Sequence, residues 1–545
     1  MSQQQQGYSQ PDWNNPPQYQ PNYNNNNNNN NNYQQQQQQH YDQEAGHPTN
    51  DYGPPPPINY ATKPNESGET FEERFKVTKP KWNDLPFTFL FLAVLGGYIA
   101  LAVITIRAYG ITHWFQGGGI YTDSNAFTLN TSTIILFVFV ITVSVVLSFI
   151  YFALARIFTK FFIYFSFIAS IIVGLATAIY YLAVGYYSAG IVFLIFAVLQ
   201  IMFFWSARSR IPFATLVLQI VIDATRAVPS IYIVSLLGAV FTTAFSIFFA
   251  ISIVSAYVKF SPNPDNPGCD VSAGSCSNGK LIGSLIFMTF AGFYISEVIK
   301  NVVHVTISGV YGTWYYCYKA DQGMPRWPAS GSFKRAMTYS FGSISFGSLL
   351  ISIVNLIRYL LEIIRSAQLQ SGEGGIAALF ITICLYCVDC FLGLIQWLIT
   401  YFNHYAYTVV ALYGKAYIPA AKDTWSIIRA RGIDALINDC LIDKVLSLGV
   451  LLIAYVAALF AYLYLRYTDP LYNSDGGYYP IVIGFTMVIA LQIGNIITVA
   501  IRAGTATFFV ALARDPDVFR LSYPGLYDEL LRAYPAVREK LGQAW

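Results

Sequence analysis

Apolar residues gather in long segments of the chain that are separated by shorter polar stretches. About 20 residues of α-helix cross a hydrocarbon core about 30 Å thick, so segments of this length predict membrane-spanning helices. They lie near residues 86–106, 132–153, 161–184, 190–205, 231–258, 281–303, 336–361, 376–402, 445–465 and 481–501. The predicted fold class is therefore all-α, a polytopic integral membrane helical bundle with about ten transmembrane helices.

A further apolar segment, residues 211–228, differs from the others because it contains Asp223 and Arg226 and is followed by Pro229. A charged side chain at the bilayer centre costs about 2.5–3.5 kcal/mol on insertion scales, which disfavours a spanning helix here. We predict an interfacial or re-entrant helix, or a lead-in to the fifth span. A spanning helix would instead move every later loop to the other side of the membrane.

Lysine and arginine residues gather in alternate loops of this ten-span arrangement. The basic loops are those at 74–81, 156–160, 208–210, 319–335, 415–431 and 514. The loops on the other side hold only Arg107, Lys259, Lys280, Arg365 and Arg466, all near helix ends. Cytosolic loops carry the excess of basic residues in membrane proteins. The pattern therefore predicts that both termini are cytosolic.

Residues 1–80 form a separate compositional block. This block contains runs of asparagine, glutamine and proline at 24–32, 34–39 and 54–57, and it is almost free of aliphatic residues. Such a segment cannot bury enough apolar surface to offset the entropy of ordering. We predict a disordered cytosolic tail, with self-association through it as a hypothesis. Residues 81–503 then form the transmembrane domain, and residues 504–545 form a cytosolic C-terminal tail.

Composition agrees with a membrane protein and gives no sign of catalysis. Hydrophobic residues make up 54% of the chain and charged residues 11%, with a mean hydropathy of +0.43. The net charge of +3 is too small to indicate nucleic-acid binding. The chain has no HExxH, GxSxG or P-loop motif. We therefore predict a protein that is not an enzyme and has no cofactor.

Cysteines and one sequon add expectations for the outer side. Cys269 and Cys276 lie in the predicted outer loop between the fifth and sixth spans, where a disulfide can form; two free thiols are the alternative. Asn130 begins a glycosylation sequon, although it lies very close to the second span. The closely spaced cysteines 384, 387 and 390 fall inside an apolar segment, so we expect buried small residues rather than a metal site.

Asp389 is the clearest charged residue inside a predicted span. At helical spacing it shares a face with the residues Gly393, Gln396, Trp397, Thr400, Asn403 and Tyr407. A polar and aromatic face within an apolar helix indicates a bundle interior or a wet pathway. The alternative is a structural seam of hydrogen bonds between helices.

The seventh span has a second polar stripe, which includes Ser348. Gly342 and Gly347 lie beside it, and small residues allow helix backbones to approach closely. Arg358 and Glu362 are four residues apart, so we predict an intramembrane ion pair between them.

Six residues just beyond the sixth predicted span, 311–316, are densely aromatic. Such a cluster suits an interfacial belt. The alternative is a cage for a quaternary ammonium group, which aromatic ring faces bind.

Three of these stretches resemble motifs of the choline transporter-like family. They are WLITYFNHYAY at 397–407 with ALYGKAY at 411–417, SFGSISFGSL at 340–349, and SGVYGTWYY at 308–316. The polar tail and the short 269–276 loop are similar to the fungal pH-nine-sensitive branch of that family. The resemblance implies a plasma-membrane solute carrier for choline or a related small organic cation.

On this hypothesis Asp389 balances the charge of the cation, and Trp397, Tyr401 and Tyr405 supply ring faces. Gln396 and Asn403 complete the predicted substrate pathway. Gly342, Gly347 and Ser348 would let the seventh span shift against its neighbours. The alternatives are a non-transporting membrane organiser that acts through the N-terminal tail, and a lipid-handling enzyme or scramblase.

Overall fold

The computed structural model of the protein describes residues 81–113, 131–262, 276–320, 323–370, 376–431, 441–468, 470 and 479–533. The N-terminal tail, the sequon at Asn130 and Cys269 lie outside these residues. Cys276 is described, and it is disulfide-bonded.

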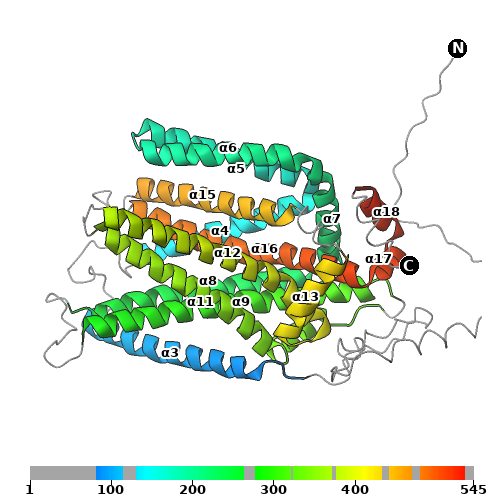
Figure 1. The fold of residues 1–545 in the computed structure, drawn as a ribbon, viewed down its shortest axis with the longest axis horizontal. Coiled ribbons are helices and arrows are strands. Elements are labelled where there is room, and N and C mark those ends of the chain that lie inside the picture. The colour runs from blue at the N-terminus through cyan, green and yellow to red at the C-terminus, as the bar shows by residue number, and fades with distance from the viewer. Residues whose placement is uncertain are drawn as a thin grey trace, which may run out of the picture. The chain divides into compact units, whose positions relative to one another are not determined.

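The part of the chain that the structure describes is helical, and ten of its helices are long and apolar enough to cross a membrane (Figure 1). These helices are α3 (Leu85–His113), α4 (Thr131–Ile157), α5 (Thr159–Ala183), α6 (Tyr187–Ala207), α8 (Ser230–Phe260), α9 (Asn278–Cys317), α11 (Phe341–Gln370), α12 (Ile376–Tyr413), α15 (Ile442–Thr468) and α16 (Tyr479–Arg514). The prediction of an all-α bundle with ten spanning helices is confirmed.

Six shorter helical elements complete the described fold. They are η1 (Arg208–Arg210), α7 (Ile211–Ala227), α10 (Pro328–Met337), α13 (Tyr417–Arg431), α17 (Pro516–Ser522) and α18 (Pro524–Ala533). The helix α7 is the segment with Asp223 and Arg226. It runs across the ends of the long helices rather than alongside them (Figure 1), and it packs against α16, α5 and α9.

Several long helices end together beside α7. Asn83, just before α3, donates a 2.7 Å hydrogen bond to the carbonyl oxygen of Gly414, just after α12. Tyr315, near the end of α9, donates a 3.0 Å hydrogen bond to the carbonyl oxygen of Asp515, just after α16. We call this the α7 end of the bundle: the end where α3 begins and where α9, α12 and α16 finish.

Several predicted boundaries were wrong, and α12 and α16 continue past the predicted ends at 402 and 501 to Tyr413 and Arg514. The sixth span continues as α9 to Cys317, so the aromatic cluster at 311–316 belongs to that helix. Tyr311, Trp314 and Tyr315 are each less than 5% exposed, because α16 and the segments after it cover them. The cluster is therefore part of the core and not an interfacial belt. The seventh span begins at Phe341 rather than near 336, because α10 ends at Met337 and a turn follows it.

Gly342 marks a close approach between the start of α11 and the chain that leads into α3. A Cβ atom on Gly342 would lie 2.3 Å from the carbonyl oxygen of Asn83 and 2.4 Å from that of Asp84. Because both obstacles are backbone atoms, they cannot rotate away as a side chain would. At Gly347 the obstacles are side chains instead, since a Cβ atom there would overlap the rings of Tyr407 and Tyr417.

We predict that Gly342→Ala lowers the melting temperature of the purified protein by several degrees, because the added methyl group forces the α3 lead-in away from α11. Gly96→Ala is the matched control. Position 96 is also helical, but it has open space around it, so alanine there should keep or slightly raise the melting temperature. An equal loss in both variants would contradict this account of Gly342.

Candidate transport site

One face of α12 forms a polar seam with α11. Arg358 donates to both carboxylate oxygens of Asp389, from Nε at 2.8 Å and from Nη2 at 3.4 Å. Its Nη1 donates to Oε1 of Gln396, and Nε2 of Gln396 donates to Oδ1 of Asn355 at 2.7 Å. Asp389 therefore already has a cationic partner within the protein.

The predicted ion pair between Arg358 and Glu362 is wrong. Arg358 reaches across to α12, where a carboxylate and an amide accept its hydrogen bonds. Glu362 pairs instead with Arg365, one turn further along α11. Helical spacing allowed the closer pairing, but a guanidinium can satisfy more of its donors between two helices than along one.

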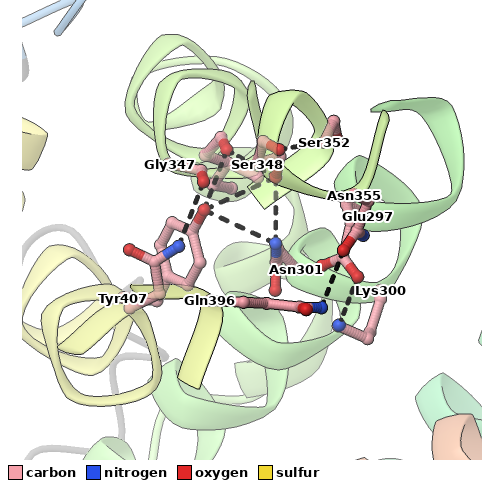
Figure 2. Close-up of polar contacts among 11 residues, drawn as sticks. Glu297, Lys300, Asn301, Gly347, Ser348, Ser352, Asn355, Gln396 and Tyr407 are labelled. Carbon is pink, nitrogen blue, oxygen red and sulfur yellow. Dashed lines mark hydrogen bonds and ion pairs between the residues drawn. The ribbon is translucent and has the colours of Figure 1, made fainter. Parts of the chain in front are cut away.

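Nearer the α7 end, the seam also includes α9. Figure 2 shows Asn301 of α9 pointing at Ser348 of α11 and at Tyr407 of α12. Nδ2 of Asn301 donates to Oγ of Ser348 at 2.9 Å and more weakly to the hydroxyl of Tyr407 at 3.4 Å. All three side chains are buried, so their hydrogen bonds to one another offset the cost of removing them from water.

The last hydrogen bonds of the seam are made by Asn403. Its Nδ2 donates a 3.0 Å hydrogen bond to the carbonyl oxygen of Gly347, and its Oδ1 accepts a hydrogen bond from the hydroxyl of Tyr417. Burial raises the pKa of Tyr417 to about 12, so its phenol stays protonated and remains a donor. We call the whole set the α11–α12 seam: Asp389, Gln396, Asn403 and Tyr407 of α12 with their partners.

A neighbouring face of α12 lines a cavity of about 720 Å³. Its walls come from five helices, and we call it the aromatic cavity. The lining residues are Phe167 and Ile171 of α5; Phe196, Leu199, Gln200 and Phe203 of α6; Trp397, Thr400, Tyr401, His404 and Tyr405 of α12; Asp443, Lys444, Ser447 and Leu448 of α15; and Arg502 of α16. Most of them lie in the half of their helix that is closer to the α7 end.

The α12 wall of the aromatic cavity is a continuous row of rings. Trp397 and Tyr401 are stacked, with ring centroids 5.8 Å apart and an interplanar angle of 25°. Tyr405 meets Tyr401 edge to face at 5.4 Å. Trp397 is 60% exposed, so its ring is accessible. Ring faces in such a row can hold a cation that lacks hydrogen-bond donors.

Charged groups enter the aromatic cavity from α15 and α16. Asp443 is the carboxylate among the lining residues, and Lys444 and Arg502 are the cations. Nη2 of Arg502 donates a 3.0 Å hydrogen bond to Oγ of Ser447, and Nζ of Lys444 lies 4.8 Å from the ring centre of Phe203. The cavity therefore combines an aromatic wall with charges of both signs.

The structure divides the predicted pathway residues between two places. Trp397, Tyr401 and Tyr405 lie together in the aromatic cavity. Asp389, Gln396 and Asn403 lie in the α11–α12 seam, as do the packing residues Gly347 and Ser348, while Gly342 lies against the α3 lead-in. The hypothesis from the sequence required these rings and the carboxylate of Asp389 to contact one cation together. In the structure they lie on different sides of α12.

Sequence reasoning missed Asp443 and His404 as candidate site residues. Asp443 stands at the very start of the ninth span, where a charged residue is ordinary. His404 lies between Asn403, which faces the seam, and Tyr405, which faces the cavity. The sequence does not show which of these two sides of α12 a residue at this position faces. The expectation that Cys384, Cys387 and Cys390 are buried was wrong, because all three are exposed on α12. Within the described residues, no group of three or more potential metal ligands could hold an ion.

Comparison with known proteins agrees with the motifs. The family model described as "Plasma-membrane choline transporter" matches residues 191–517, more than half of the chain. The chain belongs to the choline transporter-like family. This stretch runs from α6 to α17, so it includes every helix that lines the aromatic cavity except α5.

Full-length relatives place the protein among fungal members of the choline transporter-like family. It is 54% identical to Protein PNS1 of Yarrowia lipolytica over 490 residues, which cover 90% of this chain and 85% of the relative. Identity to Protein PNS1 of Saccharomyces cerevisiae is 52%, covering 87% and 88%. For Protein PNS1 of Candida albicans it is 50%, covering 89% and 92%. The predicted resemblance is confirmed.

We predict that Tyr417→Phe destabilises this family member by about 1–3 kcal/mol, because Oδ1 of Asn403 loses its donor while it stays buried. The measurement is thermal unfolding of the purified protein in detergent. Tyr467→Phe is the control, since Tyr467 is 83% exposed. A melting temperature that is unchanged in Tyr417→Phe would show that the seam does not depend on this hydrogen bond.

Proposed function

We propose that the protein is a plasma-membrane carrier for choline or a related small organic cation, and that the solute binds in the aromatic cavity. The observation that carries this proposal is the row of rings on α12 inside a cavity formed by five helices. Family membership supports a membrane transporter, and the description of the family supports the plasma membrane and choline.

The ring row suits a quaternary ammonium group for a physical reason. Such a group has no N–H donor, so polar residues gain little by contact with it, whereas the negative face of an aromatic ring attracts it. Each desolvated contact of this kind contributes about 0.5–2 kcal/mol. Trp397 and Tyr401 present neighbouring rings at the distance of a stacked pair, and together they can cover one side of the ligand.

Asp443 replaces Asp389 as the carboxylate in this proposal. Asp389 is held by Arg358, so it has little charge left for a ligand. Asp443 lines the aromatic cavity, and among the described residues its Oδ1 is a buried atom without a hydrogen-bond partner. A cation in the cavity would be attracted to the negative charge of this carboxylate.

The two faces of α12 link binding to movement in this proposal. The seam attaches α12 to α11 through hydrogen bonds at several levels, while the opposite wall of the cavity belongs to α5 and α6. A shift of α11 and α12 as one unit would widen or close the cavity while the hydrogen bonds between these two helices stay intact. The solute is moved and not chemically changed in this proposal.

Choline uptake into proteoliposomes that contain only the purified protein tests the proposal. We expect uptake above that of empty vesicles, and Trp397→Ala should raise the KM for choline by about tenfold, because a loss of about 1.4 kcal/mol in binding is a factor of ten. Trp327→Ala is the matched control, since Trp327 is 70% exposed and lies before α10, away from the cavity.

The stability of each variant is checked by its melting temperature before uptake is compared. Absence of choline uptake by well-folded wild-type protein would withdraw choline as the solute. Uptake that is equally affected by Trp397→Ala and Trp327→Ala would remove the aromatic cavity as the binding site.

A further inference from the structure

The aromatic cavity contains more positive charge than a site for a simple cation needs. Two of the charged side chains that line it, Lys444 and Arg502, are cationic, against the one carboxylate of Asp443. Like charges repel strongly where water is scarce. The ring wall alone suits a quaternary ammonium group, but Lys444 and Arg502 would weaken the binding of a ligand that carries only a positive charge.

Arg502 and Lys444 both line the aromatic cavity, so the charges of both act on a ligand bound there. Nη2 of Arg502 donates to Oγ of Ser447, whereas within the described part of the chain its Nε is buried without a hydrogen-bond partner. An anionic group of a bound ligand would be attracted to the guanidinium charge of Arg502, and Lys444 on the neighbouring helix would add a second positive charge.

The size of the cavity also exceeds what choline alone requires. Its volume of about 720 Å³ lies within the range of about 300–1,000 Å³ that is typical for drug-sized ligands. Choline is far smaller than such ligands. Besides the ring wall, the cavity is lined by Asp443, Lys444, Ser447 and Arg502 and by mostly apolar residues of α5 and α6.

We propose that the preferred ligand of the aromatic cavity is a zwitterion that joins a quaternary ammonium to a phosphate, in other words a phosphocholine group. The ammonium group lies on the rings of Trp397 and Tyr401, and the phosphate pairs with Arg502, whose planar guanidinium matches phosphate oxygens. This inference rests on the proposed function, because it specifies the ligand of the same cavity. The group can come from a soluble ester or from a phosphatidylcholine headgroup.

The test is the affinity of the purified full-length protein for choline and for glycerophosphocholine. The protein is placed in nanodiscs of phosphatidylethanolamine and phosphatidylglycerol, which lack choline, and each ligand is titrated by calorimetry. We expect glycerophosphocholine to bind at least about tenfold more tightly than choline, in line with the strength of a charge-assisted hydrogen bond.

Arg502→Gln should move the two affinities in opposite directions. Glycerophosphocholine should bind about tenfold more weakly, because the phosphate loses its partner, whereas choline should bind a few-fold more tightly, because a repulsive charge is gone. Arg466→Gln is the matched control, since Arg466 lies in the last turn of α15, far from Lys444 at its start. If Arg502→Gln does not fold, Lys444→Gln is used instead, and the affinities for glycerophosphocholine and choline should again change in opposite directions.

Two results would overturn the inference: glycerophosphocholine that binds no more tightly than choline, or a substitution at Arg502 that weakens both ligands together. Nanodiscs of phosphatidylcholine separate the two sources. Weaker binding of glycerophosphocholine there indicates that the lipid headgroup occupies the site, and unchanged binding indicates a soluble ester. Choline uptake with no preference for glycerophosphocholine would overturn this inference alone and leave the proposed function standing.

Discussion

The need to partner the charged and amide groups of α11 and α12 within the membrane governs how these helices pack. Arg358, Asp389 and Gln396 would each be costly in hydrocarbon, and they are tolerated because α11 and α12 bring them together. The same requirement holds along the seam to Asn403 and Tyr407. This seam fixes the azimuth of α12 and so decides which of its residues face the aromatic cavity.

Much of the fold could be predicted from the sequence because a spanning helix is recognised from one continuous stretch of residues. Each spanning helix is a long apolar segment, and the ten predicted segments coincide with α3 to α16 except where a helix continues past the apolar stretch. The extension of α9 to Cys317 is the clearest case. Its last turns contain Tyr311 and Trp314, whose polar edges suggested an interface, but tertiary packing buries them.

The site could be predicted only in part because it depends on azimuth and on partners distant in sequence. Helical spacing placed Asp389 and Trp397 on one broad face of α12, but they lie on its two sides, one against α11 and the other in the cavity. No pattern within α12 shows that Arg358 forms its ion pair with Asp389 rather than with Glu362. Asp443 and Arg502 reach the cavity from helices that only the folded chain brings near the rings.

The most direct test of the account is the protection of a cysteine by choline. Leu448→Cys, in the aromatic cavity, is compared with Asn355→Cys, in the seam, after alanine replaces Cys384, Cys387, Cys390 and Cys440. A thiol reagent is then applied to the purified protein with and without choline. The account predicts that choline slows modification at 448 and leaves the rate at 355 unchanged. Protection at 355 without protection at 448 would contradict it, because the solute would then bind in the seam.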